Sequence, residues 1–406
     1  MRPLPMRPLL LAIALLLVSS VTVRAKEPEP VTLNFAHTGT LATETRVLEH
    51  EIKLSGDFAV RDAAGKELPA SYDKKAGKLL ILAAIPAGGA QFTLHQGVKS
   101  KAKLPSWKKH KTETEKQQID LGKKIKRVTA ELQNDLLKLE LPAEKTIHGR
   151  IELKALKGNW HLFVSPLGAS VGCVETAAMG EAVDESYRKG EPSHPEVFVV
   201  YPSIATKAEV LEPNPFQRTL RVETFVYARK NSDAKLDLFD ETGFEATLTW
   251  GSPVVTIRSW RKLKTTFFNH NGVNLNEIYL DALPIQLQCD AEAEPRELDL
   301  KPGGKVGPFD FERTLWMRDK TGACVIHQPD FKRLGVYKPC TVATPDRIMT
   351  VISQSWHEGW KAIEIKAGDY NDTMTIACNV GDSPKKLKDW ITEIDPPAPL
   401  DPPAPE

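Results

Sequence analysis

The feature that most constrains the fold of this chain is a series of short runs in which apolar and polar residues alternate. The run VLEHEIKL, residues 47–54, is the clearest example. One side of it would carry Leu48, His50, Ile52 and Leu54, and the other Glu49, Glu51 and Lys53. Because successive side chains of a strand point to opposite faces, the pattern predicts a strand. Such runs recur about every ten residues between Gly and Pro, which predicts a small all-β unit.

Longer strands are predicted after residue 128. The run RTLRVETFVYAR, residues 218–229, has one face with Leu220, Val222 and Thr224 and a second, more polar face. The run at 244–263 predicts two strands joined by a Gly-Ser-Pro turn. Helical periodicity is weak, and the best candidate is a short helix at 383–394. The chain is therefore predicted to be all-β, with a small N-terminal β-barrel followed by a large antiparallel, supersandwich-like β-sandwich.

The two ends of the chain differ in composition from the rest of the sequence. Residues 1–25 combine Arg2 and Arg7 with an apolar run and a small-residue ending, the pattern of a secretory signal peptide. The apolar run, about 10 residues, is short for a bilayer of roughly 30 Å, and an uncleaved anchor is the alternative. We therefore expect a secreted or periplasmic protein without membrane contact after cleavage. The C-terminal end repeats DPPAP, which is typical of an extended, disordered tail.

A basic segment separates the two β-rich regions. Residues 99–127 hold eleven Lys or Arg against three acidic residues. A solvated linker is one interpretation and a patch for an anionic polysaccharide is the other. The predicted divisions are a signal peptide (1–25), a small β-barrel domain (26–98), a basic linker (99–127), a large β-sandwich domain (128–394) and a Pro-rich disordered tail (395–406).

Charge and cysteine content exclude several classes of function. Removing residues 1–25 leaves 51 of the 54 basic residues against 53 acidic ones, which gives no nucleic-acid signature. The five cysteines contain no C-x-x-C pair, so we expect no zinc site, and no motif predicts a cofactor. Cys324 and Cys340 are the closest pair in sequence, but spacing alone does not fix a disulfide.

Three clusters combine Trp with polar residues. Trp faces stack on sugar rings, and neighbouring charges bind hydroxyl or carboxylate groups. The candidate substrate-binding residues are Trp160 and His161 in the first cluster, Arg258 and Trp260 in the second, and Trp356, His357, Glu358 and Trp360 in the third. The alternative for each cluster is that Trp belongs to the sandwich core and the charges are solvated. No catalytic residue is assigned from these patterns.

The basic residues of the second cluster suggest one reaction. A lyase that acts on a uronic acid must neutralise the carboxylate so that the α-proton can leave, and it needs a His, Tyr or Lys base. Arg258, Arg261 and Lys262 could supply the positive charge. The sequence contains these residue types but does not show whether they lie close together in the folded chain.

Several sequence segments resemble segments of carbohydrate-active proteins. Residues 58–97, FAVRDAAGKELPASY through IPAGGAQFTLHQG, resemble a small β-barrel phrase found before the catalytic or sandwich regions of several such families. ELQNDLLKLELP, at 131–142, resembles the opening strand of galactose-mutarotase-like sandwiches, with Asn134 and Asp135 at its turn. The Gly251-Ser252-Pro253 strand pair resembles a later part of the same sandwich. The order is similar to that of exo-rhamnogalacturonan-lyase-like proteins and of the sandwich regions of α-mannosidase-like enzymes.

The resemblance implies an exported carbohydrate-active protein, most concretely a polysaccharide-lyase-like protein acting on an acidic glycan. Two alternatives remain open, a non-catalytic carbohydrate-binding module and a structural envelope protein. The expected partner is a carbohydrate, which could be an anionic polysaccharide. The resemblance covers residues 31–290 and is architectural, so it transfers no catalytic residue and says nothing about residues 291–394.

Overall fold

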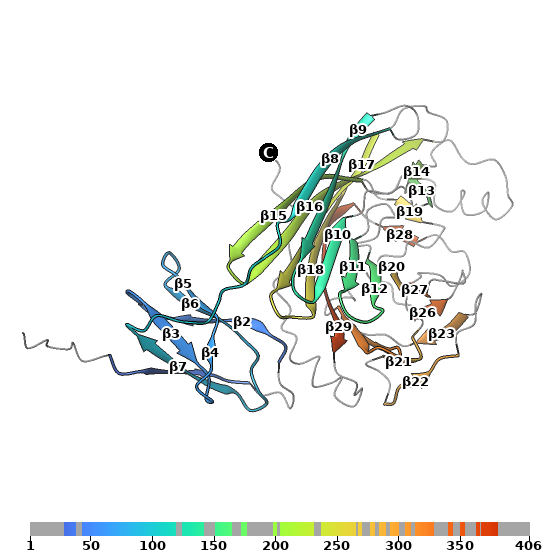
Figure 1. Cartoon of the computed structure of the whole chain (residues 1–406). Helices are drawn as coiled ribbons and strands as arrows, with labels where there is room; N and C mark the ends of the chain where they lie inside the picture. The colour runs from blue at the N-terminus through green and yellow to red at the C-terminus, as the bar shows by residue number, and fades with distance from the viewer. Residues whose placement is uncertain are drawn as a thin grey trace, which may run out of the picture.

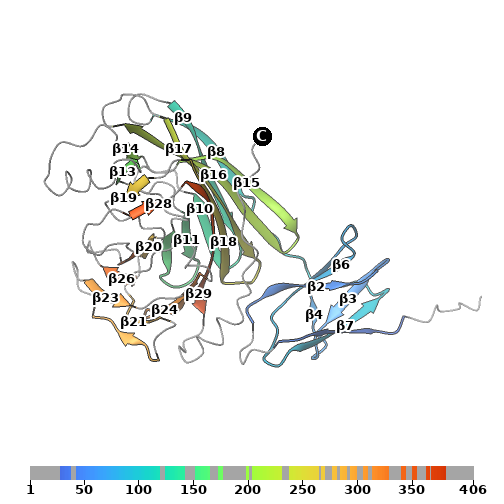
Figure 2. The ribbon, with the colours of Figure 1, turned by 180° about the vertical axis from the view of Figure 1, so that it is seen from behind.

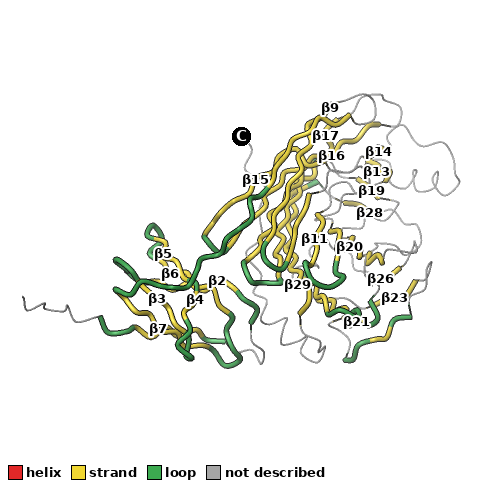
Figure 3. Tube along the Cα trace, viewed as in Figure 1, coloured by secondary structure: helices red, strands yellow, loops and turns green. Residues whose placement is uncertain are grey.

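In the computed structural model of the chain, the regular secondary structure of the described part is all β-strand, joined by loops and turns (Figure 3). The structure describes residues 28–37, 43–118, 124–141, 151–164, 172–176, 198–200, 204–230, 237–264, 267–269, 277–280, 284–289, 293–299, 305–309, 313–328, 340–343, 350–353, 363–365 and 367–380. The predicted signal peptide, the predicted helix at 383–394 and the predicted tail lie outside these residues. Over the described ranges, no helix is long and apolar enough to cross a membrane.

The N-terminal unit contains seven strands in two small sheets (Figure 1). They are β1 (Val31–Phe35), β2 (Arg46–Glu51), β3 (Phe58–Arg61), β4 (Glu67–Leu68), β5 (Ala70–Asp73), β6 (Lys78–Ala83) and β7 (Ala90–Gln96). One sheet has the order β1-β7-β3-β4 and the other β2-β6-β5. Leu33, Leu79, Ile81 and Leu94, all fully buried, pack between them. The all-β expectation is confirmed, but the described strands form two facing sheets rather than one closed barrel.

A nine-stranded sheet forms one layer of the larger unit. Its strands are β8 (Lys111–Gln118), β9 (Lys124–Gln133), β10 (Leu137–Leu141), β11 (Ile151–Ala155), β12 (His161–Val164), β20 (Glu277–Leu280), β23 (Lys305–Phe309), β26 (Cys340–Ala343) and β27 (Thr350–Ser353). Strands β8 and β9 pair over residues that the sequence analysis placed largely in a solvated linker. These residues therefore form strands and not only a linker. The alternation in KTETEKQQ and KIKRVTAELQ allows strand pairing despite the high charge.

A thirteen-stranded sheet forms the second layer. Its strands are β13 (Gly172–Thr176), β14 (Phe198–Val200), β15 (Ile204–Asn214), β16 (Gln217–Lys230), β17 (Asp237–Thr249), β18 (Val254–Leu263), β19 (Phe267–Asn269), β21 (Gln286–Cys289), β22 (Arg296–Glu297), β24 (Thr314–Arg318), β25 (Ala323–His327), β28 (Ile363–Ile365) and β29 (Gly368–Val380). All its pairings are antiparallel. Figure 2 shows the long central strands β16, β17 and β18 from behind.

The two layers share one large hydrophobic core, which confirms the predicted sandwich. Leu137 and Leu139 on β10 face this core, as do Val255 and Ile257 on β18. In each strand these residues are two apart, so the intervening side chains lie on the outer faces of the sandwich. The sequence pattern therefore determines which side chains of each strand face the core and which lie on the outer face.

The two turns named in the resemblance meet in the folded chain. The side chain of Asn134 accepts hydrogen bonds from the backbone N–H of Leu136 and Leu137, at 2.8 and 2.6 Å. Its amide nitrogen donates to the carbonyls of Thr249 and Ser252, at 2.7 and 3.0 Å. Asn134 thereby ties the β9–β10 hairpin of one layer to the β17–β18 turn of the other.

An aromatic junction joins the N-terminal unit to the sandwich. Leu80 and Leu82 on β6 pack against Phe216, and Trp250 covers the same cluster. Trp107, from the segment between the units, lies edge-on to Trp250 with ring centroids 5.4 Å apart. Its indole N–H donates to the carbonyl of Pro215 at 2.9 Å. We call these five side chains the junction cluster.

Candidate functional site

The predicted site residues lie in different parts of the molecule. Trp160 is 1% exposed and packs in the sandwich core, which fits the alternative interpretation of its cluster. His161 follows it on β12 and lies on the outer face of the nine-stranded sheet. Arg258 and Trp260 lie on β18 in the other sheet. The third cluster, Trp356, His357, Glu358 and Trp360, is outside the described residues, and its role stays a prediction.

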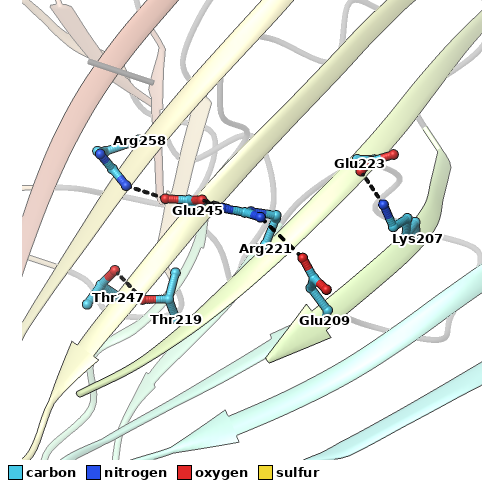
Figure 4. Close-up of polar contacts among 8 residues, drawn as sticks. All are labelled: Lys207, Glu209, Thr219, Arg221, Glu223, Glu245, Thr247 and Arg258. Carbon is cyan, nitrogen blue, oxygen red and sulfur yellow. Dashed lines mark hydrogen bonds and ion pairs between the residues drawn. The ribbon is translucent and has the colours of Figure 1, made fainter. Parts of the chain in front are cut away.

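Arg258 belongs to a row of charges across the outer face of the thirteen-stranded sheet (Figure 4). Glu245 on β17 is bonded by Arg258 from β18 and by the Nε of Arg221 from β16, the latter at 2.8 Å. Arg221 also reaches Glu209 on β15 at 3.3 Å. Glu245 raises the pKa of Arg221 through its hydrogen bond and charge. The side chain of Glu245 is only 4% exposed, and the row links the four strands β15, β16, β17 and β18.

Trp260 lies on the same outer face as Arg258, opposite a glycine. Its cross-strand partner is Gly243 on β17. A Cβ added at Gly243 would lie 2.5 Å from two atoms of the indole ring, so the ring rests directly on the backbone of the neighbouring strand. Trp260 is 7% exposed. In this position the indole packs against the backbone of the neighbouring strand.

A different polar group lies on the inner face of the same sheet, which also carries the core. Beyond the core residues, one lateral row runs through Thr224 on β16, Thr242 on β17, Arg261 on β18 and Tyr370 on β29. Cross-strand partners share a face, so these four side chains point to the same side. The hydroxyls of Thr224 and Thr242 are bonded to each other. Arg261 is 5% exposed, which is rare for a guanidinium group.

A second row lies one step closer to the core. Ser259 on β18 pairs with Asp372 on β29, and the amide of Gln328 donates to the Asp372 carboxylate at 3.0 Å. All three are buried. We call the two rows together the inner polar rows; their members are Thr224, Thr242, Ser259, Arg261, Gln328, Tyr370 and Asp372. The two rows thus place a buried guanidinium and a buried carboxylate on the same face of the sheet.

The charge state of Tyr370 depends on both burial and its neighbour. Burial raises the pKa of the phenol, and the positive charge of Arg261 opposes that rise. The phenol is therefore protonated near neutral pH and can donate a proton. A cation, a carboxylate and a phenol on one face are the types of group that bind an anion and transfer a proton.

The sequence analysis found only part of this group. It named Arg261 beside Arg258 and placed Thr224 on the same face as Leu220 and Val222. It missed Tyr370, Asp372 and Gln328, because the sequence does not show that β29 pairs with β18 or that β25 pairs with β29. The available signal was the alternation in β18: Arg258 and Trp260 fall on one face, and Arg261 falls on the other.

His161 takes part in a second polar row, on the outer face of the nine-stranded sheet. Its Nε2 lies 3.5 Å from the carboxylate of Glu152, which also pairs with Lys154 at 2.9 Å. The contact with His161, followed by the contact with Lys154, lowers the pKa of Glu152 to about 2. Lys154 and Lys138 continue the row through Glu140. Every acidic residue of this row has a basic neighbour, so we interpret the row as a stabilising network of ion pairs.

No metal site emerges in the described ranges, where no group of three or more His, Cys, Asp and Glu side chains is placed to hold an ion.

Comparisons with known proteins add information on architecture. No protein-family model matches the chain, and no curated protein matches it. An α-mannosidase from Enterococcus faecalis V583 gives a TM-score of 0.44 at 12% identity, covering 92% of this chain and 46% of that chain. A glycosyl hydrolase family 38 protein from Enterococcus faecalis gives 0.41 at 12% identity, covering 92% and 48%. The galactosidase domain of an α-galactosidase–sucrose kinase gives 0.34 at 8% identity, covering 62% and 41%.

This chain thus spans less than half the length of each of these three structures. All three are described as glycoside-processing proteins. Neither a lyase nor a mutarotase is among the three, so that part of the sequence-based expectation stays a prediction.

Proposed function

We propose that this chain is an exported carbohydrate-active protein that acts, in the manner of a polysaccharide lyase, on an acidic glycan at the inner polar rows. The observation that carries the proposal is the cross-strand pair of Arg261 and Tyr370. A uronate lyase needs a cation against the carboxylate and a proton-transfer group beside it. Residues 1–25 have the pattern that supports export.

The proposed reaction is a β-elimination. Arg261 binds the uronate carboxylate and stabilises the negative charge that develops when the α-proton leaves. Asp372, two residues from Tyr370 on the same face of β29, accepts that proton. The electron pair forms the carbon–carbon double bond as the glycosidic carbon–oxygen bond breaks, and the protonated phenol of Tyr370 donates its proton to the leaving oxygen. The products are an unsaturated uronate and a shortened chain.

The test is an incubation of the purified chain with a panel of polyuronates and sulfated uronate glycans. The expected result is growth of the ultraviolet absorbance of an unsaturated uronate together with chain shortening. Tyr370→Phe is expected to lower the rate by about 10²–10⁴-fold, the usual contribution of a general acid. Lys262→Gln is the matched control, because Lys262 lies on the opposite face of β18 and should leave the rate unchanged.

Each outcome separates this proposal from its alternatives. No unsaturated product from any glycan would rule out the lyase. Retention of a glycan on the immobilised protein without product would favour a non-catalytic binding module. If no glycan is retained, a structural envelope protein with a protein partner becomes the favoured interpretation.

A further inference from the structure

Two of the cysteines are direct neighbours on adjacent strands. Cys324 on β25 and Cys378 on β29 are cross-strand partners in the antiparallel pairing of these strands. Both side chains are fully buried and belong to the sandwich core. Both are free thiols in this structure, and as cross-strand partners their side chains lie side by side on one face of the sheet.

The backbone spacing at this position suits a disulfide. Directly opposed residues of an antiparallel pair have Cα atoms about 4.5–5.5 Å apart, and disulfides join Cα atoms about 4.4–6.8 Å apart. Opposed side chains also share a face of the sheet, so their Cβ atoms point in the same direction. The pair is directly opposed, and the register of the ladder shifts just before it, between Ala323 and Cys324.

The other cysteine with a described side chain is too far away to compete. Cys289 on β21 is separated from β25 by the intervening strand β24. Two strand spacings amount to about 9–10 Å, beyond the roughly 7 Å limit for a disulfide without backbone movement. Cys340, the nearest cysteine to Cys324 in sequence, lies on β26 in the other sheet.

We propose that Cys324 and Cys378 are oxidised to a cross-strand disulfide when the chain folds in the presence of a disulfide oxidant. Each thiol loses its proton, one sulfur–sulfur bond forms, and the two electrons reduce the disulfide of the oxidant to two thiols. The bond forms before the core closes, because both sulfur atoms are inaccessible afterwards. Burial also raises the pKa of the Cys324 thiol, so the reactive thiolate is scarce once the chain is folded.

This bond would fasten the strands that hold part of the inner polar rows. Gln328 directly follows β25, and Asp372 lies on β29. Their hydrogen bond spans the same strand pair as the two cysteines. The disulfide would keep β25 and β29 in register and so keep Gln328 against Asp372, independently of what the inner polar rows bind.

The test is peptide mapping of the full chain refolded with a mixture of oxidised and reduced glutathione. Free thiols are blocked with N-ethylmaleimide under denaturing conditions, and the protein is then digested without reduction. We expect one linked pair of peptides containing Cys324 and Cys378, which separates on reduction, and a blocked Cys289. If Cys324 and Cys378 both carry the blocking group, or if either is linked to another cysteine, the proposal is wrong.

Two variants sharpen the result. Cys289→Ser should keep the linked pair, because Cys289 is not part of it. Cys378→Ser should leave Cys324 reactive towards N-ethylmaleimide after denaturation and lower the thermal midpoint of the oxidised protein towards that of the reduced wild type. The wild-type map needs neither variant, so the proposal stays testable even if a variant fails to fold.

Discussion

At the scale of single residues, the position of a side chain on one or the other face of a strand decides its role. Arg258 and Arg261 are three residues apart on β18 and lie on opposite faces. Arg258 joins an outer row of ion pairs, whereas Arg261 is buried in the inner polar rows. Two identical residue types in one short motif therefore have different environments, and only Arg261 meets Tyr370.

Glu152 gives a prediction about pH. Its pKa is about 2 in the folded chain, lowered from 4.5 mainly by His161 and then by Lys154. A lowered pKa stabilises the fold fully above about pH 4.5, and this stabilisation is lost as the pH falls towards 2. Because solvent screens the row, we expect Glu152→Gln to lower the free energy of unfolding by about 1 kcal/mol near neutral pH.

The measurement is urea unfolding of the wild type and Glu152→Gln between neutral pH and about pH 2.5. The difference between them should shrink as the pH falls. Glu113→Gln, on an exposed position of β8, is the control and should match the wild type throughout. A difference that stays constant with pH would show that the pKa of Glu152 is not the cause.

Gly243 gives a prediction about packing. An added methyl group at this position would lie 2.5 Å from the ring of Trp260, so Gly243→Ala must push the indole away. We expect a loss of about 1–3 kcal/mol in the free energy of unfolding, typical of overpacking. In a Trp260→Ala background the same change should cost much less, and denaturant unfolding of the four proteins measures this coupling. Equal costs in both backgrounds would contradict the contact.

At the scale of elements, a single buried side chain links two hairpins that belong to different sheets. Asn134 makes four hydrogen bonds, two within its own turn and two to the turn at 249–252. Asp135, its neighbour, adds one bond from the N–H of Gly251 at 2.7 Å, at an exposed position. The two turns thus fix how the layers of the sandwich are aligned at this end.

Replacing Asn134 should therefore cost more than replacing Asp135. Asn134→Ala removes the amide donor to the carbonyl of the buried Ser252 and one of two donors to the carbonyl of Thr249, and it removes the acceptor of two backbone N–H groups. We expect a loss of about 3 kcal/mol. Asp135→Ala should cost about 1 kcal/mol or less. Thermal and urea unfolding measure both changes. A larger effect of Asp135→Ala would mean that the link between the layers lies elsewhere.

At the scale of the whole molecule, the junction cluster determines whether the two units unfold together. Phe216 is fully buried between Leu80 and Leu82 of the N-terminal unit and Trp250 of the sandwich. Arg218 adds a cation–π contact 5.1 Å from the ring centroid of Trp107. The contact is apolar and aromatic, so it couples the units through packing.

Phe216→Ala should uncouple the two units. Loss of a buried Phe costs about 3–5 kcal/mol, and here most of that loss falls on the contact between the units. We expect calorimetry to show a separate, earlier transition for the N-terminal unit and proteolysis to cleave the segment before Trp107. Leu104→Ala, in the same segment but 48% exposed, is the control and should leave the wild-type transition. A single unchanged transition in Phe216→Ala would argue against the coupling.

The sequence by itself determined the class of fold and the faces of strands such as β2 and β16. Alternation in VLEHEIKL and RTLRVETFVYAR, with turns at Gly65 and Gly251, was enough to predict these strands, because the period of two is a local property of the chain. The pairing of β8 with β9 was not predicted, because residues 99–127 are highly charged and strand pairing depends on the partner strand as well as on composition.

Only the tertiary structure decided which distant residues meet. Arg261 and Tyr370 are more than a hundred residues apart in sequence, and so are Asn134 and Thr249. Cys324 pairs in space with Cys378 and not with Cys340, its nearest cysteine in sequence. The physical reason is that strand order and register are set by burying one continuous core, a property of all the strands together that no local pattern contains.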